Sequence, residues 1–339
     1  MTGGGGQAER HLRIVARLHG YPPHHNAGAE WMLHSMLRAL VARGHEVQVW
    51  LTRYGHAQDP YEMDGVKVVP LSARLDATSA IRTADVVVSH LEGVPSTAAL
   101  ARGFGRPLVV VCHNGHDSTF RDVAAGSTAL AVYNSQWMAR AADIYFADRP
   151  EALRPETTLV VRPPVFADDY RTKPGKAVTL INCCPEKGGL LFADLARRMP
   201  DTPFLAVKGA YGEQIIPDLP NVEVLEHMDG HAMREQVYAR TRVLLMPSGY
   251  ESWGRAGVEA LASGIPVIAH PTPGLSESLG AAGLFANRGE PDAWEAVLRR
   301  LESPAEYRLA SKNAKARSTE LDPQGDLAAW CEHVEALAA

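Results

Sequence analysis

The chain has 339 residues, of which 46% are hydrophobic, and a formal net charge of -5. Its length predicts two domains, because one hydrophobic core rarely grows beyond about 250–300 residues, and its negative charge excludes a nucleic-acid partner held by a basic surface. No run reaches the roughly 20 apolar residues of a membrane span and the N-terminus lacks the apolar core of a secretory signal, so we expect a cytoplasmic protein.

Short β-branched runs alternate with helix-length segments in the first half, which is typical of a parallel α/β sheet. Residues 27–43 place leucines on one face and are followed by Gly44, which predicts a crossover helix between the first two strands. The predicted strands of this half are residues 12–18, 46–51, 66–71, 85–90, 107–112 and 128–133. Six such strands predict one doubly wound unit.

A proline-rich segment without periodicity, residues 162–176, then predicts an interdomain linker. The alternation restarts after it, with strands expected at residues 177–182, 203–209, 222–225, 242–247, 265–269 and 283–286. We therefore expect two facing Rossmann-like domains with a cleft between them, residues 1–165 and 166–322. Residues 323–339 are expected to form a C-terminal helix that packs back towards the N-terminal domain.

The most informative stretch is residues 247–277, where a buried strand turns into a helix that Gly264 ends. A helix N-terminus at the carboxyl edge of a parallel sheet is where ligands of such folds bind. Its free N–H groups and dipole favour an anion such as a diphosphate. The residues expected to contribute these groups are Ser252, Trp253, Gly254 and Arg255.

Two glutamates, Glu251 and Glu259, stand eight residues apart, which is roughly 12 Å along a helix at about 1.5 Å per residue. This separation is near the span from the sugar to the ribose of a nucleotide sugar. The segment GYESWGRAGVEALASGIPVIA resembles the signature of the family-4 glycosyltransferases, which have the GT-B fold and transfer sugars with retention. The resemblance implies that Glu251 contacts sugar hydroxyls near the reacting carbon and that Glu259 binds the ribose.

A second match is INCCPEKGG, which resembles the Pro-Glu-Lys-Gly turn of the same family. The resemblance makes Lys187 the lysine that binds the diphosphate and stabilises the leaving group. The chain departs from the family at Asn182, where many relatives carry a second phosphate-binding arginine. Asn182 can still donate a hydrogen bond to a phosphate, while Arg255 or Lys208 could replace the missing charge.

The N-terminal half carries weaker matches to the family. Gly28 opens a helix in a loop that resembles the family's first loop, and lacks a Cβ that would keep the donor away. His113 follows a buried strand and matches a histidine near the donor sugar. Asn134 and Ser135 are interpreted as a helix cap. His24 and His25 could be groups on the acceptor side, but we interpret both as exposed loop histidines.

The resemblance implies catalysis by Glu251, Lys187 and His113 without an enzymic base, the leaving phosphate oxygen taking the acceptor's proton. No two aspartates stand two positions apart, so the metal-binding DxD motif is absent, and we expect neither a metal nor another cofactor. The expected donor is a nucleotide-diphosphate sugar carrying a hexose. The acceptor is open, with a soluble small molecule or saccharide favoured over a lipid, and so is the oligomeric state.

Two other functions stay open on the sequence. A nucleotide-sugar 2-epimerase also has two Rossmann-like domains but uses no acceptor. A two-lobed binding protein without catalysis would share the fold. A dehydrogenase is excluded, because no GxGxxG motif occurs in the chain.

Overall fold

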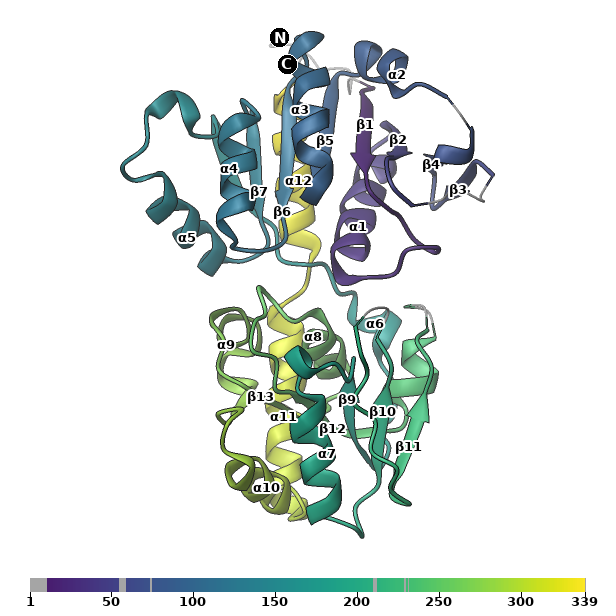
Figure 1. The fold of residues 1–339 in the computed structure, drawn as a ribbon, viewed down its shortest axis with the longest axis vertical. Coiled ribbons are helices and arrows are strands. Elements are labelled where there is room, and N and C mark those ends of the chain that lie inside the picture. The colour runs from purple at the N-terminus through teal and green to yellow at the C-terminus, as the bar shows by residue number, and fades with distance from the viewer. Residues whose placement is uncertain are drawn as a thin grey trace, which may run out of the picture.

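The computed structural model describes residues 11–54, 59–73, 75–209, 212–228, 230 and 232–338. Residues 1–10 of the predicted N-terminal domain and residue 339 of the predicted C-terminal helix lie outside the described residues. Two α/β units are stacked along the long axis of the molecule (Figure 1). The predicted α/β class, with two parallel-sheet units, is confirmed. The domain limits themselves stay a prediction.

The first sheet runs in the order β3-β4-β2-β1-β5-β6-β7-β8 and is parallel except for the antiparallel β3–β4 pair. Every residue of its three neighbouring strands β5, β6 and β7 is buried, as expected of strands that helices cover on both faces. The strands are β1 (Arg13–Leu18), β2 (Glu46–Leu51), β3 (Tyr61–Met63), β4 (Val66–Val69), β5 (Val86–His90), β6 (Leu108–Cys112), β7 (Leu130–Tyr133) and β8 (Thr157–Val160).

The prediction of six strands for this sheet is wrong, because β3 and β8 add to it at its two edges. The β3–β4 hairpin turns through Asp64 and Gly65, which both have positive φ. This Asp-Gly pair was a recognisable hairpin signal. Strand β8 is four residues long and half exposed, so it lacks the apolar run by which the other strands were found.

The second sheet runs in the order β11-β10-β9-β12-β13-β14, with parallel pairing throughout. All six predicted strands of this half are present. They are β9 (Ala177–Ile181), β10 (Phe204–Val207), β11 (Val222–Leu225), β12 (Thr241–Met246), β13 (Val267–Ala269) and β14 (Leu284–Phe285). Strands β9 and β12 pair in parallel in the middle of this sheet, which places the loops after both strands side by side at one edge.

Helices cover both sheets. Those of the N-terminal unit are α1 (Gly28–Ala42), α2 (Ala77–Thr83), α3 (Val94–Gly103), α4 (Asp117–Ala125) and α5 (Gln136–Phe146). The segment between the sheets contains α6 (Ala167–Tyr170), and the rest are α7 (Gly189–Arg198), α8 (Arg255–Ala262), α9 (Pro273–Leu279), α10 (Pro291–Arg300), α11 (Pro304–Glu320) and α12 (Gln324–Ala336). None of the helices in the described part is long and apolar enough to span a bilayer.

The C-terminal helix α12 leaves the second unit and lies against α1 of the first (Figure 1). Trp330 is fully buried there, and its indole N–H donates to the carbonyl of Met36 at 2.9 Å. Asp326, in the first turn of α12, accepts from the backbone N–H and the guanidinium of Arg162 at the start of the linker. These contacts tie the end of the chain to its first unit.

We expect Trp330→Ala to destabilise the protein by about 3–5 kcal/mol, because it removes a large buried side chain and leaves a cavity against α1. Urea unfolding followed by circular dichroism measures the effect. Glu332→Ala, on the exposed face of the same helix, is the control and should change stability by less than about 0.5 kcal/mol. Equal stability of the two variants would show that α12 does not hold the first unit.

Candidate active site

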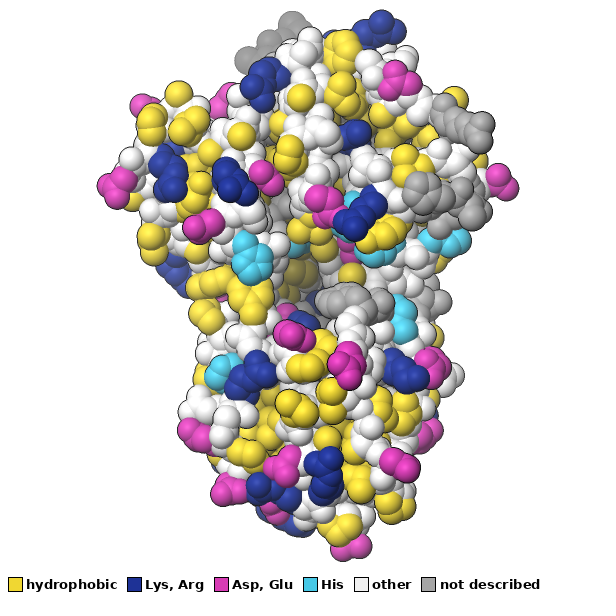
Figure 2. Space-filling model, in the orientation of Figure 1, with side chains coloured by type: hydrophobic (Ala, Val, Ile, Leu, Met, Phe, Trp, Pro, Cys, Tyr) yellow, Lys and Arg dark blue, Asp and Glu magenta, His cyan; other side chains and the backbone are white. Residues whose placement is uncertain are grey.

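A cavity of about 400 Å³ lies between the two units, and residues of both line it. Figure 2 shows the hollow at the waist of the molecule. Predicted site residues form much of its wall: Gly28, His113, Lys187, Glu251, Ser252, Trp253, Gly254 and Arg255. Two predicted residues, Asn182 and Glu259, are not among the residues that line it.

Helix α8 points its N-terminus at this cavity. Gly254 precedes it with φ 83°, a left-handed conformation that side chains disfavour, and a Cβ at this position would lie 2.4 Å from Leu275. Glycine is therefore required for the loop to turn into the helix at this angle. The free N–H groups and the dipole of the helix start make this wall of the cavity suitable for an anion.

Lys187 and Glu251 meet at the wall of the cavity. The ammonium of Lys187 donates to Oε1 of Glu251, and Ser248 donates to the same oxygen at 3.0 Å. Gly188 lets the turn of Lys187 pack this closely, because its φ is 97° and a Cβ there would overlap Pro247. The arrangement places a cation suited to phosphate and a carboxylate suited to sugar hydroxyls on one wall.

Beneath this wall, Arg255 and Glu259 form a buried ion pair. Nε of Arg255 donates to Glu259 Oε1 at 2.6 Å, and Tyr238 donates to Oε2 at 2.6 Å. Although burial lowers the pKa of Arg255, the neighbouring Tyr170 and Glu259 raise it overall. Both carboxylate oxygens of Glu259 are thus engaged by protein groups. The charge of Arg255 is balanced by Glu259, which makes it a poor substitute for a missing phosphate-binding arginine.

The side chain of Asn182 forms hydrogen bonds within the C-terminal unit, in the loop after β9. It adopts φ 64°, and its side-chain oxygen accepts from the backbone of Cys184 and from Gln214. The second suggested replacement cation, Lys208, pairs with Glu226 at 2.7 Å and does not line the cavity.

Arg288, which sequence reasoning missed, lies next to the turn that carries Lys187. Its guanidinium donates to the carbonyl of Pro185 at 3.0 Å, and one of its nitrogens lies 2.2 Å from where a Cβ of Gly249 would be. No sequence pattern marks Arg288, which follows β14, because only the tertiary structure brings it to the turn of Lys187.

His113 joins the two units. Its carbonyl accepts from Ser252 Oγ at 2.6 Å and from Asn134 at 3.2 Å, and Asn134 also donates to Ser252. Its ring is hydrogen bonded to His90 at 2.9 Å, and burial lowers the pKa of His113 to about 4. A neutral imidazole at this place can donate or accept a hydrogen bond but carries no charge at neutral pH.

Gly28 is the first residue of α1, and a Cβ added to it would meet no protein atom within 4 Å. Packing therefore does not demand glycine here, and the open space belongs to the cavity. The cap of α5 is Ser135, which accepts from the N–H of Met138, while Asn134 lines the cavity. The interpretation of both residues as a cap is right for Ser135 and incomplete for Asn134.

Further residues of the cavity wall were missed or set aside. The hydroxyl of Tyr250 accepts from the N–H of Gly115 across the units at 2.7 Å. His25, set aside on the sequence as an exposed histidine, lines the cavity together with His19 and Glu30. Tyr250 could have been predicted to line the cavity, because it directly precedes Glu251 in the sequence. No local sequence pattern indicates that His19 contacts Glu30.

Two families match the chain, one in each half. Residues 27–166 match the family described as glycosyl transferase 4-like domain, and residues 219–317 match glycosyl transferases group 1. The chain belongs to the family-4 glycosyltransferases of the GT-B fold. The predicted family and fold are confirmed.

Relatives with known functions match this glycosyltransferase over short segments. D-inositol 3-phosphate glycosyltransferase of Corynebacterium urealyticum is 37% identical over 76 residues, which are 22% of this chain and 18% of that protein. The MMP α-(1→4)-mannosyltransferase of Mycolicibacterium hassiacum is 33% identical over 115 residues, 32% of this chain and 28% of that protein. The matches thus span less than a third of these relatives.

Solved structures share the fold of this glycosyltransferase over nearly its whole length. Sucrose-phosphate synthase of Thermosynechococcus elongatus superposes with a TM-score of 0.71 at 16% identity, covering 94% of this chain and 96% of that one. HepE of Anabaena, solved with UDP-glucose, gives a TM-score of 0.71 at 17% identity and covers 96% and 98%. At these identities the likeness establishes the fold alone.

We expect the stability of this glycosyltransferase to fall as the pH drops from 6.5 towards 4, in part through His113. The unfolded histidine takes up a proton near its ordinary pKa of 6.5, whereas the folded one does so only near pH 4, so acid favours the unfolded chain. The fall should be smaller in His113→Gln. Melting temperatures across this pH range measure it.

The control for this experiment is His24→Gln, at an exposed histidine, which should keep the pH dependence of the parent protein. The same slope in His113→Gln as in the parent would contradict a neutral, buried His113.

Proposed function

We propose that the protein is a retaining glycosyltransferase that moves a hexose from a nucleotide-diphosphate sugar to a hydroxyl of an acceptor. The observation that carries the proposal is the meeting of Lys187 and Glu251 beside the start of α8, in a cavity between the two units. A nucleotide sugar presents a diphosphate and a polyhydroxylated ring next to each other. The wall of the cavity offers a cation with a helix N-terminus and a carboxylate in the same order.

In this proposal Lys187 neutralises the charge that develops on the leaving diphosphate, together with the N–H groups at Ser252, Trp253 and Gly254. Because Lys187 already contacts Glu251, a donor must enter by sharing or displacing this ion pair. Arg288, which donates to the Lys187 turn but does not line the cavity, is a further base that we assign to the diphosphate side. Asn182 and Lys208 are held in contacts outside the cavity.

We propose that Glu259 binds the ribose of the donor. Its carboxylate is buried and accepts from both Arg255 and Tyr238. It can receive a ribose hydroxyl only if one of these bonds is shared or exchanged. Arg255 then serves to hold Glu259 in position as a carboxylate, which is a positioning task.

We propose transfer on one face of the sugar. The bond from the anomeric carbon to the phosphate oxygen breaks, the acceptor oxygen forms the new bond, and its proton passes to the departing phosphate oxygen. Two carboxylates line the cavity within the described residues, and neither is a free base: Glu251 is bound by Lys187, and Glu30 by His19. His113 faces the reacting sugar as a neutral hydrogen-bonding group.

Several observations favour particular substrates. HepE was solved with UDP-glucose, and the relatives of similar sequence are named as inositol-phosphate glycosyl- and mannosyltransferases, which supports a nucleotide-hexose donor. A soluble acceptor remains favoured over a lipid, because the arginines in and directly after α1 are engaged by other side chains. Arg43 is paired with Glu335, and Arg38 lies near Asp64 and Phe166.

The test is turnover of a panel of nucleotide-diphosphate hexoses with soluble hydroxyl acceptors, the product anomer being read by NMR. We expect Lys187→Ala and Glu251→Ala each to reduce kcat by about 100-fold or more, because one loses stabilisation of the leaving group and the other the sugar contact. Lys67→Ala is the control. Lys67 pairs with Glu46 at 3.4 Å and does not line the cavity, so its removal should leave kcat unchanged.

Circular dichroism of each variant is used to check that the fold persists. Unchanged kcat in Lys187→Ala or Glu251→Ala would overturn the assigned roles, and an inverted product would overturn retention. Epimerised donor formed without an acceptor would identify an epimerase, and donor binding without any turnover a binding protein.

A further inference from the structure

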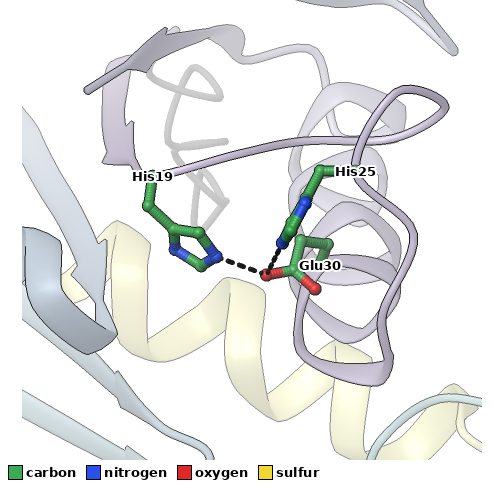
Figure 3. A group of neighbouring side chains, drawn as sticks. All are labelled: His19, His25 and Glu30. Carbon is green, nitrogen blue, oxygen red and sulfur yellow. Dashed lines mark ion pairs between the residues drawn. The ribbon is translucent and has the colours of Figure 1, made fainter. Parts of the chain in front are cut away.

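Three side chains of the N-terminal unit converge on one wall of the cavity. His19 follows the end of β1, His25 lies in the loop before α1, and Glu30 is in the first turn of α1. Figure 3 shows both imidazoles directed at the same carboxylate oxygen. Nε2 of His19 lies 2.9 Å from Glu30 Oε1, and Nε2 of His25 lies 3.8 Å from it. One ligand atom from each residue falls within 4.8 Å of the others.

This group is buried and incompletely satisfied. Glu30 is 1% exposed and His19 4%, while His25 is partly open to the cavity. The second oxygen of Glu30 and Nδ1 of His19 are buried without a hydrogen-bond partner among the described residues. Leaving buried polar atoms unpaired is costly, and most are paired in folded proteins. A buried carboxylate that lies beside two imidazoles and has an unpaired oxygen can bind a cation.

The surrounding charges do not supply that cation. Nδ1 of His19 lies 3.8 Å from Glu92, which adds a second carboxylate rather than a base. The guanidinium of Arg53 is engaged by Glu92 at 3.0 Å and is 62% exposed. On its other side, the ring of His19 stacks on His90, which is fully buried. Among the described residues, the ion-pair partners of Glu30 are the two histidines and neither a lysine nor an arginine.

We propose that His19, His25 and Glu30 bind one divalent transition-metal cation of the zinc class. Two imidazole nitrogens and one carboxylate oxygen are a preferred ligand set for such a cation, and three protein ligands leave one position open. Bond lengths of about 2.0–2.2 Å around a tetrahedral ion put the ligand atoms roughly 3.3 Å apart. The separations of 2.9 and 3.8 Å to Glu30 lie on either side of this value.

All three ligands line the same cavity as Lys187 and Glu251, so the open position of the metal faces the substrates. This use of the site rests on the proposed function: the metal would hold a hydroxyl oxygen of the acceptor on the N-terminal side. It does not touch the diphosphate, whose charge falls to Lys187. The site is thus separate from the metal–diphosphate chemistry that the missing DxD motif argues against.

The experiment uses the full chain without a polyhistidine tag, stripped with a chelator and dialysed against zinc chloride. Bound metal is measured by inductively coupled plasma mass spectrometry, and affinity by competition with a zinc-sensitive dye. We expect one equivalent of zinc in the parent protein and a rise in its melting temperature. His25→Ala should weaken zinc binding by about 100-fold or more, because it removes a direct ligand.

His24→Ala is the matched control, since it removes the adjacent, exposed histidine, whose ring packs against Tyr61. It should bind zinc like the parent protein. Glu30→Gln is a second variant of nearly the same shape and should also lose the zinc-induced rise in melting temperature. Less than stoichiometric zinc in the parent protein, or equal affinity in His25→Ala and His24→Ala, would overturn the site.

Metal content is measured on the protein alone, so it is independent of whether a sugar is transferred. If transfer occurs, removal of zinc should raise the KM for the acceptor several-fold and leave the KM for the donor unchanged. An unchanged acceptor KM at full zinc occupancy would overturn the acceptor-holding role. Absence of any transfer would count against the proposed function and not against the metal site.

Discussion

The loop between β12 and α8 determines how the cavity is built, because it must serve both units at once. Within it, Glu251 faces Lys187 of the same unit, while Ser252 donates to the carbonyl of His113 in the other unit. Asn134 bonds both partners of this contact. Two neighbouring residues thus connect the wall that carries Lys187 to the N-terminal unit, and any movement of the units against each other changes the cavity at Glu251.

The positive charges of the C-terminal unit are largely committed to protein partners. Arg255 is held by Glu259 and Lys208 by Glu226, while Lys187 is the lysine that lines the cavity. Lys187 itself contacts Glu251. In the proposed donor complex, the diphosphate competes with this carboxylate for Lys187.

The wall of the cavity that the N-terminal unit forms has a different chemistry from the wall that carries Lys187 and Glu251. It carries His19, His25 and His113 with the buried Glu30, and burial keeps His113 neutral near pH 7. Imidazoles can hold hydroxyl groups or a metal without adding permanent charge. Under the proposed function, an acceptor on this side meets hydrogen-bonding groups, whereas the donor meets the charged groups Lys187 and Glu251.

The sequence by itself determined most of the strands, the start of α8 at Arg255 and the presence of Lys187 and Glu251 near strand ends. These features depend on local patterns: apolar runs, glycines at helix ends, and the rule that parallel strands end at one edge. The edge strands β3 and β8 were missed because they are partly exposed and lack apolar runs. Only the tertiary structure decided that Glu259 is enclosed by Arg255 and Tyr238 and that His19 reaches Glu30. Such contacts join residues far apart in the chain through side-chain packing and burial, which no local pattern encodes.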